Sequence, residues 1–77
     1  MMARYNGHRS WNAWNVALWI GNDEGLYGLA MDCLRECRTL AIATRKFIHV
    51  VGDGSKTPDG AVYNRTCVHE ALAGLRE

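Results

Sequence analysis

Residues 11–20 read WNAWNVALWI, and this stretch decides how the rest of the 77-residue chain folds. It holds all three tryptophans of the sequence. In a helix, Trp11, Trp14 and Leu18 share one face, because positions three and four apart lie side by side. Each indole removes about 150–250 Å² from water when it is buried. We therefore expect residues 11–20 to form the helix around which the core is built.

The composition is typical of one small globular domain. Hydrophobic residues make up 48% of the chain and charged residues 22%, which is too apolar for a disordered protein. A chain of this length has room for one core, so residues 1–77 are assigned to a single domain. A core this small often gains stability from a partner copy, and a homodimer fits the sequence as well as a monomer does.

No segment predicts export or membrane insertion. The N-terminal residues lack the apolar stretch of a secretory signal. The longest apolar run, residues 40–51, is interrupted by Arg45 and Lys46 and is too short to cross a bilayer. Three cysteines, an odd number, argue against a secreted disulfide framework. We predict a cytoplasmic protein that makes no membrane contact.

Apolar spacing predicts a second amphipathic helix directly after the first. Gly21 and Asn22 end the first helix, and Asp23 caps the second, with Glu24 in its first turn. Apolar residues then recur every three or four positions. They are Leu26, Leu29, Ala30, Cys33, Leu34, Cys37, Leu40 and Ala41. We expect a break near Thr39 or Thr44, either of which could cap a third helix.

Residues 47–51 could form a helix or a strand, because the run is rich in β-branched residues. Helix is preferred, since no second strand is available to pair with it. Residues 52–60, GDGSKTPDG, are the clearest loop, and they lack the spacing of a phosphate-binding loop. A last helix is expected over residues 66–76, and it would bury Val68, Leu72 and Leu75. The predicted fold is all-α: a compact bundle of three to four short helices with an irregular N-terminal arm, in which Ser10 or Asn12 caps the first helix.

The cysteines and histidines complete no catalytic or metal-binding pattern. Cys33 and Cys37 lie one helical turn apart and could bind zinc together with Cys67 and a histidine, but both also occupy core positions of their helix. Cys67 and His69 are two positions apart, so they would point to different sides of a helix. We expect no enzymatic activity, no cofactor and no metal site. The remaining alternative to a core role for the cysteines is a disulfide between two copies of the chain through Cys67.

Charges are unevenly distributed along the chain, although the net charge is only +1. Acids dominate the predicted second helix, and basic residues dominate the segment that follows it. Asp32 and Glu36, one turn apart, could present a negative stripe to a basic groove on another protein, with Asp23 and Glu24 beside it. These four are the predicted partner-binding residues. The alternative is a solvated helix face that binds nothing.

Four basic residues support a second hypothesis. Arg4, Arg9, Arg45 and Lys46 could contact phosphate groups if the fold gathers them, and aromatic side chains could stack on bases. A nearly neutral domain lacks the basic excess that drives nucleic-acid affinity. Direct binding of nucleic acid therefore ranks below binding of a protein.

Two motifs resemble a family of small proteins encoded by bacteriophages and prophages. The first runs from Tyr5-Asn6-Gly7 through residues 11–20 to Asn22-Asp23-Glu24-Gly25-Leu26-Tyr27, and the second is Thr57-Pro58-Asp59-Gly60. Members of the family are expected to have Glu-Thr where this chain has Asn12-Ala13, so the first helix is capped differently here.

The resemblance implies an accessory phage protein made in the cytoplasm of an infected bacterium. It brings no catalytic residues with it. Small non-enzymatic phage proteins are often inhibitors of host defence, including anti-CRISPR proteins. The expected function is inhibition of a bacterial defence complex, such as a CRISPR effector, by binding a protein surface that handles nucleic acid. A small phage nucleic-acid-binding or regulatory protein is the alternative.

Overall fold

Four short helices make up the fold of this computed structural model, which describes His8 and residues 10–76. They are α1 (Trp11–Asn22), α2 (Glu24–Glu36), α3 (Leu40–Val51) and α4 (Arg65–Arg76). The predicted all-α bundle is thus confirmed. Residues 47–51 are helical, as preferred from the sequence. None of the four described helices is long and apolar enough to cross a membrane.

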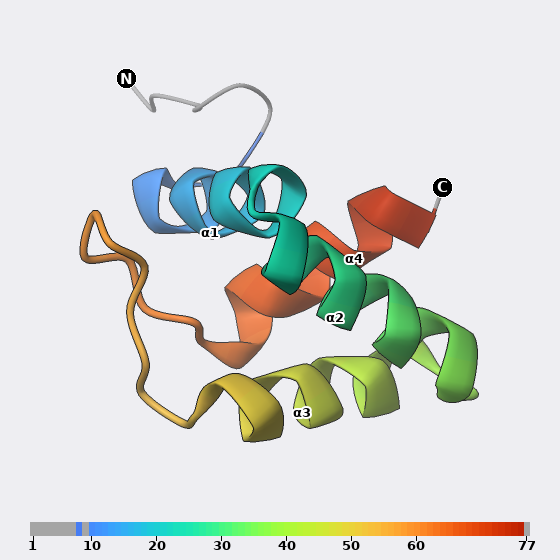
Figure 1. Ribbon diagram of the computed structural model, residues 1–77. Helices are drawn as coiled ribbons and strands as arrows, with labels where there is room; N and C mark the ends of the chain where they lie inside the picture. The colour runs from blue at the N-terminus through green and yellow to red at the C-terminus, as the bar shows by residue number, and fades with distance from the viewer. Residues whose placement is uncertain (1–7, 9, 77) are drawn as a thin grey trace.

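Each of α1 and α3 packs against both α2 and α4 (Figure 1). The first and third helices lie on opposite sides of the bundle, while α2 and α4 lie between them. The core therefore forms where all four helices meet. Its largest fully buried side chains include Phe47, Ile20 and Leu72. Tyr63, from the segment before α4, also packs inside, with its ring centroid 6.2 Å from that of Phe47.

Local side-chain caps explain where the helices begin. The side chains of Ser10, Asp23 and Thr39 accept hydrogen bonds from the backbone N–H three residues ahead, at the first turns of α1, α2 and α3. All three had been predicted as caps, with Asn12 and Thr44 as alternatives. Thr44 is instead buried within α3, where its hydroxyl donates to the carbonyl of Leu40.

The end of α1 differs from the prediction. Gly21 and Asn22 are still helical, and the chain turns at Asp23, which adopts an extended backbone conformation with φ of −89°. Asp23 closes α1 through its backbone N–H, which donates to the carbonyl of Trp19, and starts α2 through its carboxylate. One residue therefore serves both helices, and no left-handed glycine is needed there.

The tryptophans do not form the centre of the core, and this part of the prediction is wrong. The buried hydrophobic face of α1 consists of Ala13, Val16 and Ile20, which recur at the same three-to-four spacing. Trp11 is 39% exposed. The other two indoles are half-buried at the edges of the helix. The aliphatic side chains of Ala13, Val16 and Ile20 belong to the core cluster, and the indoles do not.

The loop between α3 and α4 is folded rather than extended. Gly52, Gly54 and Gly60 adopt positive φ angles, which glycine reaches at no steric cost. Lys56 and Val62 form an isolated antiparallel bridge. The loop turns back at residues 57–61 and lies against α1, as described below.

Candidate functional site

The four predicted partner-binding residues lie along the outer side of α2. Asp23 and Glu24 are exposed at its start, and Asp32 and Glu36 are exposed at its end. At 1.5 Å per residue, Glu24 and Glu36 are separated by about 18 Å along the helix. The structure therefore places all four at the surface, but as two separated pairs and not as one compact cluster.

Both acids at the end of α2 already have a cationic partner. Asp32 pairs with Arg35 one turn later. Glu36 pairs with Lys46 of α3 at 2.5 Å. The hydrogen bond from Lys46 lowers the pKa of the Glu36 carboxyl and raises the pKa of the Lys46 ammonium group. This end of α2 thus presents mixed charge.

The cysteines occupy different environments in the bundle. Cys33 and Cys67 are buried, and Cys37 is half-buried. Burial, followed by the neighbouring Cys37, raises the pKa of the Cys33 thiol. The sulfur of Cys67 accepts a hydrogen bond from the side-chain amide of Asn12 at 3.2 Å. Cys67 is therefore not presented at the surface for a disulfide between copies.

Among His8 and residues 10–76, no three or more histidine, cysteine, aspartate or glutamate side chains lie in a group that could hold a metal ion. His69 is exposed while Cys67 is buried, so these two side chains face different surroundings.

Residues 10–19 and 57–62 form a polar contact that the sequence did not predict. Asn15 donates to the Asp59 carboxylate at 2.9 Å and accepts from the Thr57 hydroxyl at 2.6 Å. The indole N–H of Trp19 donates to the same Asp59 oxygen at 2.9 Å. Hydrogen bonds from Asn15 and then Trp19 lower the pKa of the Asp59 carboxyl.

A second part of this contact involves Asn12, which joins the backbone of Val62 twice. Its amide donates to the Val62 carbonyl at 2.9 Å, and its carbonyl accepts from the Val62 N–H at 2.8 Å. The hydrogen bonds of Asn15 to Thr57 and Asp59 bring the two motifs that carry the family resemblance into direct contact. Because these polar groups satisfy one another, they hold the loop in place rather than offer a binding site.

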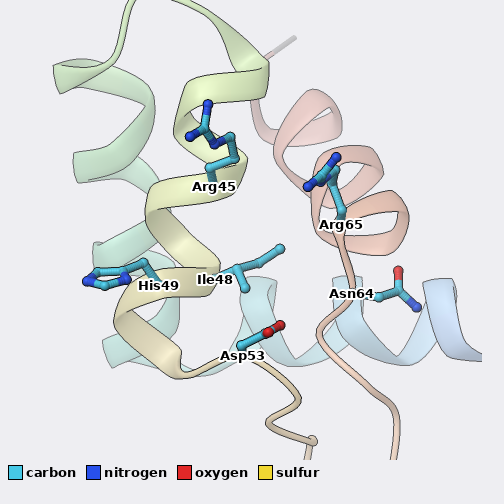
Figure 2. Close-up of a pocket in the computed structure, with 6 residues that line it drawn as sticks. All are labelled: Arg45, Ile48, His49, Asp53, Asn64 and Arg65. Atoms are coloured by element: carbon cyan, nitrogen blue, oxygen red, sulfur yellow. The ribbon is translucent and has the colours of Figure 1, made fainter.

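A cleft between α3 and α4 is the surface feature that sequence reasoning missed. It has a volume of about 360 Å³, and Figure 2 shows its lining residues. They are Arg45, Ile48, His49, Asp53, Asn64 and Arg65. Of these, only Arg45 had been considered as a contact for a macromolecule. The cleft brings together residues from two helices and a loop, which explains why no local sequence pattern marks it.

Two arginines dominate the cleft. Arg45 and Arg65 are exposed, and neither forms an ion pair with any residue in the described part of the chain. In Figure 2 both guanidinium groups lie on one side of Ile48, and Asp53 lies on the other. Asn64 points outward and caps α4 by accepting from the N–H of Cys67 at 2.8 Å.

Of the remaining predicted basic residues, Lys46 lies on α3 beside Arg45 and is held by Glu36. Arg4 and Arg9 lie outside the described residues. The structure therefore places Arg45 and Lys46 on one helix and adds Arg65, which the sequence analysis had not selected.

Comparison with known proteins gives one match. A family model described as a family of unknown function (DUF7249) matches residues 1–74. No curated protein and no solved structure matches the chain.

Proposed function

The chain belongs to the DUF7249 family, and we propose that it acts by binding a macromolecule and not by catalysis. The proposed role is that of a phage- or prophage-encoded inhibitor of a bacterial defence complex, such as an anti-CRISPR protein. It would act in the cytoplasm of the host by covering a protein surface that handles nucleic acid. Such surfaces are basic, because they bind phosphate.

The observation that carries the proposal is the outer face of α2. Glu24, Asp32 and Glu36 are exposed along it. Tyr27 is 43% exposed on the same helix, and tyrosine is enriched at protein interfaces. Acidic side chains exposed along a helix are chemically complementary to a basic groove, and Tyr27 adds an exposed aromatic ring one turn after Glu24.

The ion pairs at the end of α2 are compatible with this role. The side chains of Asp32 and Glu36 are each 53% exposed. Ion pairs between exposed side chains contribute little to stability, about 0–1 kcal/mol. A partner's arginines or lysines can therefore replace Arg35 and Lys46 at low cost.

A plaque assay tests the proposed function. The protein would be expressed in bacteria whose CRISPR system targets a phage, and plaque formation by that phage would be counted. In a strain that carries the targeted defence system, we expect expression to raise the number of plaques by orders of magnitude. Failure to restore plaques across strains carrying different defence systems would contradict the inhibitor role.

A pair of matched variants tests the surface. Asp32→Lys reverses one charge on α2, while leaving the Asp23 cap and the pair of Glu36 with Lys46 in place. Asp53→Lys makes the same change of net charge on the α3–α4 side. We expect Asp32→Lys to reduce plaque restoration at least about tenfold, as loss of a good interface charge contact would, and Asp53→Lys to retain it. Equal effects would exclude α2 as the contact face.

A further inference from the structure

The cleft between α3 and α4 continues into two neighbouring hollows. One, of about 560 Å³, is lined by Ile42, Arg45, Lys46 and His49. The other, of about 390 Å³, is lined by Arg65, Thr66, His69 and Glu70. Arg45 and His49 are shared with the first hollow, and Arg65 is shared with the second. The three hollows thus form one continuous surface across α3 and α4, called here the α3–α4 track.

The free charge on the α3–α4 track is positive. Lys46 is paired with Glu36, and Glu70 is paired with His8. Of the described residues that line the track, Arg45 and Arg65 are the cations without an ion pair, and Asp53 is the carboxylate without one. Each guanidinium group has five N–H donors in a planar fork, a geometry that fits the oxygens of a phosphate group.

Apolar and planar side chains lie between these charges. Ile48 lines the central cleft, between the two arginines and Asp53. Ile42 is 44% exposed in the adjoining hollow, and His49 and His69 lie exposed along the track. Unpaired bases pack on such surfaces, whereas the bases of a duplex are stacked inside it and do not reach them.

We propose that the α3–α4 track binds a single strand of nucleic acid, with Arg45 and Arg65 holding backbone phosphates and the isoleucines and histidines contacting the bases. A free mononucleotide has the same phosphate chemistry, but it would fill only one of the three hollows. The track therefore fits a strand. This inference goes beyond the proposed function and does not depend on it, because it concerns other helices and another ligand.

Fluorescence anisotropy with a labelled 20-nucleotide single strand, as DNA and as RNA, tests the proposal on the full chain. With two phosphates neutralised, the slope of log affinity against log salt is expected to be about −1.4, since single strands give about −0.7 per phosphate. A matched duplex and adenosine monophosphate are the comparison ligands. Absence of strand binding at low salt, or tighter binding of the duplex or the mononucleotide, would overturn the proposal.

Charge variants locate the binding. Arg45→Gln with Arg65→Gln is expected to abolish the salt dependence assigned to the track and to weaken binding about tenfold or more. The matched control is Lys56→Gln with Arg76→Gln, which removes the same charge elsewhere on the surface and should leave affinity within about twofold. Arg4 and Arg9 are unchanged in both double variants. If the strand binds through them, the first double variant will keep its affinity, and that result would exclude the track as the binding site.

A gain of affinity provides a readout that misfolding cannot imitate. Asp53→Asn removes the carboxylate of the central cleft that has no ion pair among the described residues, so binding of the strand is expected to tighten by about threefold to tenfold. Unchanged or weaker binding by this variant would contradict the placement of phosphates in the central cleft. Plaque restoration with Asp32→Lys reports on α2 alone, so failure of one proposal leaves the other standing.

Discussion

Thr57 and Asn15 lie 42 positions apart in the sequence, yet the hydroxyl of Thr57 donates a 2.6 Å hydrogen bond to the side-chain carbonyl of Asn15. Both side chains are buried. The same hydroxyl oxygen accepts from the backbone N–H of Ala61 at 3.0 Å, which closes the turn of the loop. The buried Asn15 thus connects α1 to the residue that closes the turn of the loop.

We expect Asn15→Ala to lower the free energy of unfolding by about 1–3 kcal/mol, because it leaves the buried Thr57 hydroxyl without its acceptor. Urea denaturation followed by circular dichroism measures this change. Asn22→Ala is the matched control, since Asn22 is exposed at the end of α1, and it should change stability by less than about 0.5 kcal/mol. Equal losses in the two variants would show that the contact with the loop contributes nothing specific.

Asp59 gives a pH-dependent prediction. Its pKa is lowered from the usual 3.8 in the folded protein by hydrogen bonds from Asn15 and Trp19. Protonation therefore favours the unfolded chain. The stabilisation from Asp59 is fully present above about pH 4 and is lost as the pH falls through the lowered pKa.

Asp59→Asn keeps an oxygen that can accept both hydrogen bonds but removes the charge. Thermal midpoints measured at about pH 6 and about pH 3 should therefore differ less in this variant than in the unchanged protein. Glu36 has a lowered pKa for a separate reason, so part of the dependence should remain. Asn22→Ala, which removes no titratable group, should retain the full pH dependence, and a reduction of the same size there would contradict the role of Asp59.

Features set by neighbouring residues were predictable from the sequence. Ser10, Asp23 and Thr39 cap helices because each is a short polar residue three positions before the N–H that it accepts from. Periodic apolar spacing likewise identified the buried Val68 and Leu72 of the last helix. These signals lie within one turn of the chain.

Features that depend on packing between helices were not predictable. Hydrophobic area alone favoured the indoles of α1, but Ala13, Val16 and Ile20 have the same spacing and are the side chains of α1 that the bundle buries in its core. Arg45 and Arg65 belong to different helices, and only the folded bundle brings them to one cleft. The hydrogen bond between Asn15 and Thr57 could not be predicted either, because only the folded chain brings these two residues together.

Comparison of two aromatic residues tests the revised core. Phe47 is fully buried and Trp11 is 39% exposed. Phe47→Ala should lower the free energy of unfolding by about 3–5 kcal/mol, and Trp11→Ala by less than about half of that, because its ring retains water contact in the folded state. Urea denaturation measures both, with Phe47→Leu as a milder variant if Phe47→Ala does not fold. A larger loss of stability for Trp11→Ala than for Phe47→Ala would contradict the revised core and support a core centred on the tryptophans.

The three thiols should react in a defined order. Cys37 is half-buried, whereas Cys33 and Cys67 are buried, and burial also raises the pKa of the Cys33 thiol. Because the thiolate is the reactive form, iodoacetamide should modify Cys37 first and the other two only as the bundle opens. Mass spectrometry of digested peptides over time measures the order, and Cys37→Ser should remove the fast phase. A homodimer linked by a disulfide would consequently form through Cys37. Fast modification of Cys67 in the folded protein, or a dimer that persists in Cys37→Ser and disappears in Cys67→Ser, would show that the last helix opens far more readily than its packing against α1 and α3 implies.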